Sequence, residues 1–238
     1  MVGNDVVDLA DVDADASTYS PRFDARVFRD EERGWMAAAP DPESARWMLW
    51  AAKEAAYKGM KRERDAAVFS PAAMQVDFES TGSAGPDGRT RLRGTVTTFG
   101  PAADSSAPPS SAARVCVEVD ADAEHVHAAA WREGELAPGF EVAAMPTVEG
   151  PGAIEASSFV RRRLVRKLAA ALGMKSARLA VGRRERVPII LIDGRPAPIG
   201  FSLSHHGRFV ACAWSPRDVR RARSLARVDS RAAHEVRA

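Results

Sequence analysis

Three short stretches of this 238-residue chain contain side chains that could carry out chemistry: Asp5 in residues 2–9, Glu54 and Lys58 in residues 47–58, and Ser204 and His205 in residues 201–207. Two carboxylates with no cysteine nearby suit Mg²⁺, which takes one or two carboxylates and completes its shell with water and substrate phosphate oxygens. Hydroxyl and imidazole groups can donate hydrogen bonds to phosphate. These stretches therefore contain the donors that a metal and phosphate site needs.

A predicted helix positions Glu54 and Lys58. Asp41 can accept bonds from the free backbone N–H groups at a helix start, and Pro42 fits the first helical position. At the helical period, roughly one face holds four side chains: Trp47, Trp50, Glu54 and Lys58. The tryptophans mark that face as buried, where a bare carboxylate is costly unless it is paired or bound to a metal. The alternative is a structural Glu54–Lys58 pair at spacing i,i+4.

Asp5 lies in the run Val2–Leu9, whose β-branched residues predict a strand. Taken alone, this aspartate is more typical of a structural carboxylate in an edge strand or a turn than of a metal ligand. The chain opens directly on this strand, without a basic region and apolar core ahead of it, and no run approaches the roughly 18 apolar residues of a membrane span. We therefore expect a cytoplasmic protein.

Antiparallel strands and a second helix account for most of the remaining chain. Strands are predicted at residues 73–78, 90–98, 114–120, 125–131, 187–192 and 208–214, with an exposed loop at 101–112. A helix over 157–172 ends at Gly173. Its basic face, residues 161–167, indicates either a solvated surface or a site for phosphate or an acidic protein. Cys116 and Cys212 lie in apolar runs and are read as buried thiols.

A weak internal repeat predicts two similar lobes. A helix followed by Gly59-Met60-Lys61 in the first half resembles the one followed by Gly173-Met174-Lys175 in the second, and each half ends on a strand with a tryptophan. We expect an α+β fold in which each lobe is a helix packed on a small antiparallel sheet, related by a pseudo-two-fold axis, with a cleft between them. The expected boundaries are 1–135 and 153–216 for the lobes, 136–152 for a linker and 217–238 for an Arg-rich tail.

Two other kinds of site are less well supported by the sequence. His125 and His127 alternate on a strand and could suggest zinc, but no suitably spaced third ligand accompanies them. Ser204 is not in a Gly-x-Ser-x-Gly turn, which argues against a hydrolase nucleophile.

Three motifs together resemble the 4'-phosphopantetheinyl transferase superfamily. These are Gly3-Asn-Asp5-Val-Val-Asp8, Trp50-Ala-Ala-Lys53-Glu54-Ala-Ala-Tyr-Lys58 and Phe201-Ser-Leu-Ser204-His205. Residues 159–214 also resemble the N-terminal half of the two-lobe, surfactin-synthetase-activating type, including the turn Gly194-Arg195-Pro196. In that type the Ser-His segment precedes the Asp strand, whereas here it follows. The resemblance therefore implies a circularly permuted order, with residues 1–135 similar to the family's C-terminal lobe.

The chain departs from that pattern at two positions. Many two-lobe members have an acid two residues after the strand Asp, where this chain has Val7. The metal would then have two protein carboxylates, with water in place of the third. An Arg that contacts the nucleotide in some members falls near Ala156, so the resemblance does not carry that contact over to this chain.

The resemblance implies transfer of the 4'-phosphopantetheine arm of coenzyme A to a serine of an acyl, polyketide or peptidyl carrier protein, releasing 3',5'-ADP. It implies that Asp5 and Glu54 hold Mg²⁺, with Mn²⁺ as an alternative, and that Glu54 takes the serine proton either directly or through a metal-bound water. The implied coenzyme A contacts are Lys58, Ser204, His205, Gly194, Arg195 and Pro196. The competing hypotheses are a nucleic-acid-binding module, for which no aromatic stacking motif is present, and a protein that binds coenzyme A without catalysis. Because one chain supplies both lobes, we expect a monomer that binds neither nucleic acid nor membranes.

Overall fold

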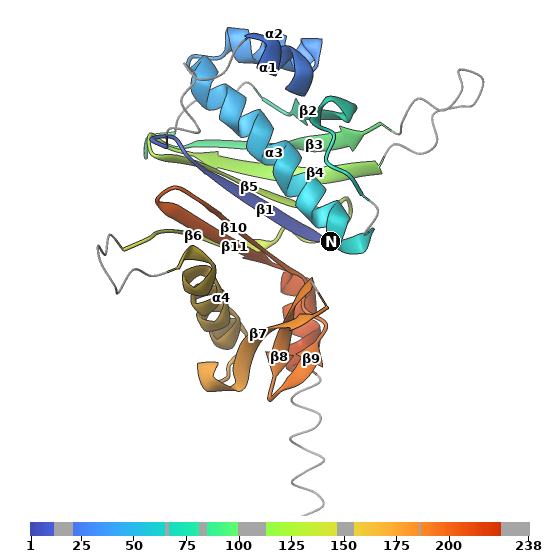
Figure 1. Ribbon diagram of the computed structural model, residues 1–238, viewed down its shortest axis with the longest axis vertical. Coiled ribbons are helices and arrows are strands. Elements are labelled where there is room, and N and C mark those ends of the chain that lie inside the picture. Colours follow the sequence, from blue (N-terminus) through green and yellow to red (C-terminus); the bar gives the residue numbers. More distant parts are fainter. Residues whose placement is uncertain are drawn as a thin grey trace, which may run out of the picture.

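The computed structural model of this chain describes residues 1–11, 21–64, 67–80, 85–99, 113–146, 155–185 and 187–224. The predicted loop at 101–112 and most of the Arg-rich tail lie outside these residues. Within them the fold is α+β, as predicted, with helices packed on antiparallel sheets (Figure 1). No helix in the described ranges is long and apolar enough to cross a membrane.

The larger lobe consists of a five-stranded antiparallel sheet crossed by one long helix. Its strands are β1 (Val2–Asp8), β2 (Met74–Phe78), β3 (Thr90–Thr98), β4 (Ala113–Ala121) and β5 (His125–Arg132), in the order β1-β5-β4-β3-β2. Helix α3 (Pro42–Glu63) lies across one face of this sheet, and α1 (Pro21–Val27) and α2 (Asp30–Ala38) pack near its N-terminal end (Figure 1). A short 3₁₀ turn, η3 (Pro71–Ala73), leads into β2.

Helix α3 begins as its sequence predicts, but of the face predicted to be buried only Trp47 is, whereas Trp50, Glu54 and Lys58 are half-buried. The Asp41 side chain accepts hydrogen bonds from the backbone N–H groups of Glu43 and Ser44, and Pro42 occupies the first helical position. Small side chains on its inner face are fully buried against the sheet: Ala51, Ala52, Ala55 and Ala56. A Cβ at Gly3 of β1 would lie 1.9 Å from the Ala55 carbonyl oxygen. Only glycine at that position allows β1 and α3 to approach so closely.

The smaller lobe contains two three-stranded antiparallel sheets and one long helix. Strands β6 (Gly139–Ala144), β10 (Phe201–His206) and β11 (Phe209–Trp214) form one sheet, in the order β10-β11-β6. Strands β7 (Leu179–Arg184), β8 (Val187–Ile192) and β9 (Arg195–Ala197) form the other. Helix α4 (Ala156–Leu172) packs on β10 and β11, the turn η4 (Ser176–Arg178) precedes β7, and residues 216–224 are helical.

The described lobes share the helix-on-sheet arrangement but differ in detail. Gly173 ends α4 with a φ of 71°, the left-handed conformation that glycine adopts readily. Residues 139–144 lie in the stretch we expected to be only linker, yet they form β6 and pair with β11. Pro138 and Gly139 obscured this short strand in the sequence. Val142 of this strand packs against the buried cluster of Val6, Phe209 and Ala211.

The lobes meet where β10 lies along the free edge of β1. Side chains of β10 replace the usual backbone partners: the Asn4 N–H donates to Ser202 Oγ at 3.1 Å and the Val6 N–H donates to Ser204 Oγ at 3.3 Å. The N–H of Asp8 donates to His206 Nδ1 at 3.0 Å. Because the partners advance together along both strands, β1 and β10 run parallel. This contact protects the outer edge of the larger sheet.

Candidate active site

The pocket that could act on a substrate lies where β1, α3 and β10 meet. It has a volume of about 330 Å³ and is lined by residues of both lobes: Asp5, Val6, Val7, Phe23, Trp47, Trp50, Glu54, Lys58, His205 and His206. Four of these were predicted as site residues from the sequence: Asp5, Glu54, Lys58 and His205. The structure therefore brings together side chains that are separated by up to 200 positions in the chain.

Strand β1 presents Asp5 to helix α3. Side chains alternate along a strand, so Gly3, Asp5 and Val7 share the face that meets the helix. Asp5 Oδ1 lies 2.6 Å from Lys58 Nζ, and its side chain is only 9% exposed. The carboxylate is thus buried next to an ammonium group that balances its charge.

One helical turn separates Glu54 from Lys58, and their side chains point into the pocket. Glu54 Oε2 lies 3.8 Å from Lys58 Nζ, and the two side chains are 20% and 32% exposed. Burial raises the pKa of Glu54; the Lys58 ammonium lowers it in opposition, and the Asp5 carboxylate raises it further. A carboxylate whose pKa is raised is a stronger base than an ordinary surface glutamate.

Ser204 lies outside the pocket lining and hydrogen-bonds to Asp5. Its hydroxyl donates to Asp5 Oδ1 at 2.8 Å, accepts from the Val6 N–H at 3.3 Å, and lies 3.5 Å from Lys58 Nζ. The residue is 6% exposed and does not line the pocket, whereas the exposed His205 does. Ser204 thus orients the Asp5 carboxylate, a contact that its position in the sequence did not indicate.

The turn Gly194-Arg195-Pro196, predicted to lie beside a nucleotide, does not line this pocket. Gly194 has a φ of 77° in the turn between β8 and β9, and Arg195 and Pro196 begin β9. Asp193 of the same turn pairs with Arg178, Nη2 to Oδ2 at 2.5 Å. These residues belong to the β7-β8-β9 sheet of the smaller lobe.

The donor set of the pocket fits a divalent cation with two protein ligands. Asp5 and Glu54 face the same cavity. Burial is the main cause of the raised pKa of Glu54, and the nearby Asp5 carboxylate adds to it. A cation bound between the two carboxylates would neutralise their charge. Val7, where a third acid is found in many two-lobe transferases, is 3% exposed and packs in the core. Among the described residues, no group of three or more histidine, cysteine or carboxylate side chains is placed to hold a metal. Mg²⁺ would complete its shell with water and substrate.

Asp8 joins the lobes and is turned away from the two pocket carboxylates. It accepts from the Arg208 backbone N–H and from both Arg208 Nε and Nη2, at 2.8 to 2.9 Å. The Arg208 hydrogen bond is the main reason that the pKa of Asp8 is lowered to about 2. Asp8 is therefore an ion-pair partner between β1 and the β10–β11 turn.

Lys53, although adjacent to Glu54, is bound on the opposite side of α3. Its ammonium donates to Glu32 Oε2 at 2.6 Å and to the carbonyl oxygens of Val27 and Pro71 at 2.8 and 3.0 Å. Glu32 in turn accepts from the N–H groups of Arg29 and Val76. This buried pair ties α2, α3 and the start of β2 together. A Lys-Glu dipeptide on a helix gives no signal of it, because Glu32 lies 21 positions upstream.

The two histidines considered for zinc lie in the contact between the lobes. His125 stacks on Phe209 and His127 lies against Phe140, each with ring centroids 4.6 Å apart. Burial lowers the pKa of His127 to about 3, and its Nε2 atom has no partner among the described residues. Both rings pack with apolar neighbours and serve the interface.

Comparison with known proteins gives one match. Residues 1–100 match the family model of the 4'-phosphopantetheinyl transferase superfamily. No curated protein and no solved structure matches the chain. The matched region contains β1, α3 and most of the pocket, including Asp5, Glu54 and Lys58. This part of the chain is therefore similar to the 4'-phosphopantetheinyl transferase superfamily.

Proposed function

We propose that this protein transfers the 4'-phosphopantetheine arm of coenzyme A to a serine of an acyl, polyketide or peptidyl carrier protein. The superfamily match supports phosphopantetheinyl transfer in general. The observation that carries the proposal is the pocket in which Asp5, Glu54, Lys58 and His205 converge from three elements of two lobes. Two carboxylates and an ammonium at the floor of a cavity suit a reaction at a pyrophosphate.

In the proposed reaction, the serine oxygen forms a bond to the phosphorus that bears the pantetheine arm. The bond from that phosphorus to the bridging oxygen breaks, and 3',5'-ADP leaves. Glu54, whose carboxyl group lines the pocket, takes the serine proton. Lys58 and His205 donate to phosphate oxygens, while Ser204 holds the Asp5 carboxylate in place.

Asp5 and Glu54 would hold Mg²⁺, or Mn²⁺ as an alternative. The cation supplies charge neutralisation on the pyrophosphate as negative charge moves to the leaving group. Its two carboxylates would be supplemented by water and substrate oxygens, because Val7 provides no third acid. Gly194, Arg195 and Pro196 remain proposed contacts of the nucleotide part of coenzyme A outside the pocket described above.

We propose further that the lobes follow a circularly permuted order relative to the surfactin-synthetase-activating type and that the protein acts as a cytoplasmic monomer. Two separate hydrophobic clusters support two lobes: one draws on residues between Val7 and Ala130, the other on residues between Val160 and Val219. The proposed bounds are 1–135 and 153–216, but the smaller lobe also includes β6 and Val219. The contribution of both lobes to one pocket supports the monomer, since no second chain is needed to complete it.

Incubation with coenzyme A, Mg²⁺ and a panel of apo carrier proteins tests the proposed function. We expect at least one carrier to gain the mass of one phosphopantetheine arm, and EDTA to prevent the gain. A chain that binds coenzyme A in calorimetry but modifies no carrier would instead be a binding protein without transferase activity. Salt-sensitive binding to DNA or RNA, with no use of coenzyme A, would favour the nucleic-acid alternative.

A further inference from the structure

His206 lines the active-site pocket but has no role in the reaction described above. It lies at the end of strand β10, directly after His205, and both residues contribute to the lining of the pocket. The motif resemblance covers Ser204 and His205 and stops before His206. The structure therefore adds a second imidazole to a pocket for which the sequence predicted one.

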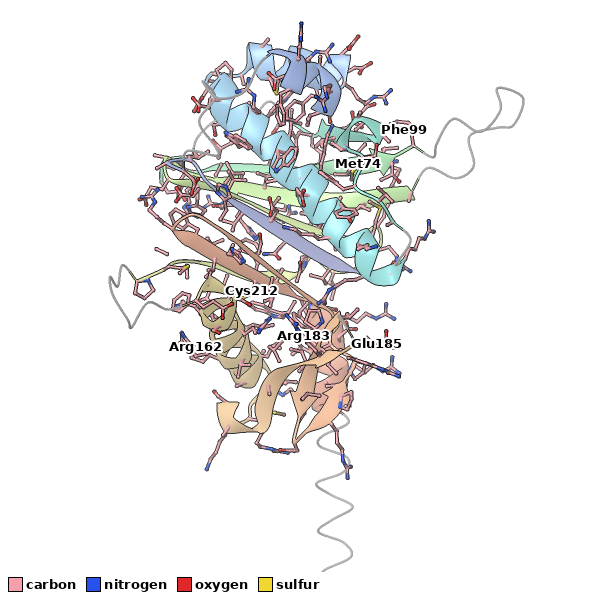
Figure 2. The ribbon with its side chains drawn as sticks, in the orientation of Figure 1. Met74, Phe99, Arg162, Arg183, Glu185 and Cys212 are labelled. Carbon is pink, nitrogen blue, oxygen red and sulfur yellow. The ribbon has the colours of Figure 1, made fainter. Side chains whose placement is uncertain are left out.

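The two histidines lie on different faces of the β10–β11 sheet. In an antiparallel pair, residues opposite each other lie on the same face. His205 is paired with Val210, which packs in the core of the smaller lobe with Cys212, labelled in Figure 2. Ser204 and His206 alternate with His205 and bond to backbone N–H groups of β1. His206 therefore faces the larger lobe, whereas His205 belongs to the opposite face.

A backbone amide fixes the position of the hydrogen on the His206 ring. The Asp8 N–H group can only donate, and its nitrogen lies 3.0 Å from His206 Nδ1. Nδ1 is therefore an acceptor, so the ring is neutral and carries its hydrogen on Nε2. No acceptor among the described residues bonds to this Nε2 atom. The ring thus retains one donor for a ligand of the pocket.

The turn after His206 holds the ring in place. Arg208 donates to the Asp8 carboxylate from its backbone N–H and from its guanidinium group. Gly207 has a φ of 49°, and a Cβ at this position would collide with Asp8 Oδ2. Three consecutive residues therefore close on Asp8. A donor that is held in this way need not be reoriented when a ligand binds.

A neutral donor suits this part of the pocket. Asp5 and Lys58 already form a charged pair there, and Ser204 bonds to Asp5 from the strand face that also holds His206. Phosphate oxygens accept hydrogen bonds from an imidazole N–H group. An uncharged ring supplies such a bond without placing another positive charge beside the Lys58 ammonium and a bound cation.

We propose that His206 binds a phosphate oxygen of coenzyme A through its Nε2 hydrogen and is a further residue of the active site. This inference rests on the proposed function. His206 then has two roles: its Nδ1 atom joins β10 to the edge of β1, and its Nε2 atom holds the substrate. Because each role uses a different nitrogen, substitutions can separate them.

Two amide substitutions make this separation. In His206→Asn the amide reaches the place of Nδ1, where its oxygen can accept from the Asp8 N–H group, but no donor reaches the place of Nε2. In His206→Gln the amide reaches the place of Nε2 and can donate there, but the Asp8 N–H group loses its acceptor. We expect His206→Asn to raise the KM for coenzyme A about tenfold, with the KM for the carrier and the urea midpoint unchanged. His206→Gln should lower the urea midpoint and change the KM for coenzyme A by less than about twofold.

NMR of the protein with isotope-labelled histidine rings gives a readout that does not depend on transfer. We expect the His206 ring to carry its hydrogen on Nε2, and the Nε2 signal to move when coenzyme A is added. Dephospho-coenzyme A, which lacks the 3'-phosphate, then identifies the phosphate. The same movement would assign the contact to the pyrophosphate, and its loss would assign the contact to the 3'-phosphate.

The contrary outcomes are distinct from one another. A wild-type KM for coenzyme A in His206→Asn, or an Nε2 signal that coenzyme A leaves unmoved, would overturn the inference. A larger rise of this KM in His206→Gln than in His206→Asn would show that the ring only joins β10 to β1. If the wild type modifies no carrier while the Nε2 signal still responds to coenzyme A, the proposed transfer fails and the contact stands.

Discussion

Lys53 and Lys58 lie on the same helix and each has a glutamate partner, but the two pairs have different surroundings. Lys53 and Glu32 are 0% and 1% exposed, and every hydrogen of the ammonium has an acceptor. Lys58 and Glu54 are partly exposed, 3.8 Å apart, and open to a cavity. The first pair is complete without a ligand, whereas the second retains donors and acceptors that a substrate can use. In this helix, a structural pair differs from a pair in the pocket by whether its hydrogen bonds are all made within the protein, not by residue type.

Removing one member of the buried pair should produce the largest change in stability. Glu32→Gln or Lys53→Met leaves an uncompensated buried charge or an unfilled set of acceptors, and we expect a loss of about 3–5 kcal/mol in the free energy of unfolding. Urea unfolding followed by circular dichroism measures it. The double variant Lys53→Met with Glu32→Leu should recover part of the loss. A loss below 1 kcal/mol in the single variants would contradict a structural role.

Removing Lys58 should affect the transfer rate more than the stability of the fold. Because the Lys58 ammonium is 32% exposed and Ser204 still donates to the buried Asp5 carboxylate, we expect Lys58→Met to lower the free energy of unfolding by about 1–2 kcal/mol, less than the Lys53 variants. Loss of a donor to the pyrophosphate should lower the transfer rate by about 10²-fold. Stopped assays of carrier modification, combined with urea unfolding, measure both quantities. Equal stability losses for the Lys53 and Lys58 variants would remove the distinction between the pairs.

The ion pair between Asp8 and Arg208 is an intermediate case, with a buried carboxylate and a half-exposed guanidinium. Asp8 has a pKa lowered to about 2 from 3.8. Since the folded pKa lies below the unfolded one, the stabilisation, about 2 kcal/mol, is complete above the unfolded pKa and is lost as the pH falls through about 4 to 2. Asp8→Asn should flatten the stability curve in that window, measured by urea unfolding at several pH values. An unaltered slope would show that the pair contributes little.

The smallest expected effect is on the pKa of Glu54 in the metal-free protein. Burial and the Asp5 carboxylate raise that pKa, and the Lys58 ammonium lowers it. Asp5→Asn removes one raising cause and should lower the pKa of Glu54, whereas Lys58→Met removes the lowering cause and should raise it. NMR titration of the Glu54 carboxyl group without Mg²⁺ measures both shifts. Shifts in the reverse directions would contradict the described contacts.

Local sequence patterns predicted most of the reactive residues of the pocket but not the ion pairs that hold the surrounding elements together. Helical periodicity placed Glu54 and Lys58 on one face of α3, and the motif resemblance linked them with Asp5 and His205. The Glu32–Lys53 pair and the Asp8–Arg208 pair join residues 21 and 200 positions apart, and no periodic signal connects them. Strand β6 was missed because Gly139 and its neighbours resemble a linker. A sequence shows which face of an element is buried, but the partners across an interface depend on the tertiary arrangement.

The central claim is that Glu54, held in the pocket with Asp5 and Lys58, serves the transfer. The most direct measurement is the rate of mass gain of an apo carrier with coenzyme A and Mg²⁺, compared among the wild type, Glu54→Gln and Glu43→Gln. Glu43 lies exposed on the first turn of the same helix and is the matched control. We predict that Glu54→Gln slows transfer by about 10²- to 10⁴-fold at unchanged unfolding stability, while Glu43→Gln leaves the rate as it is. Transfer by folded Glu54→Gln at the wild-type rate would contradict the account.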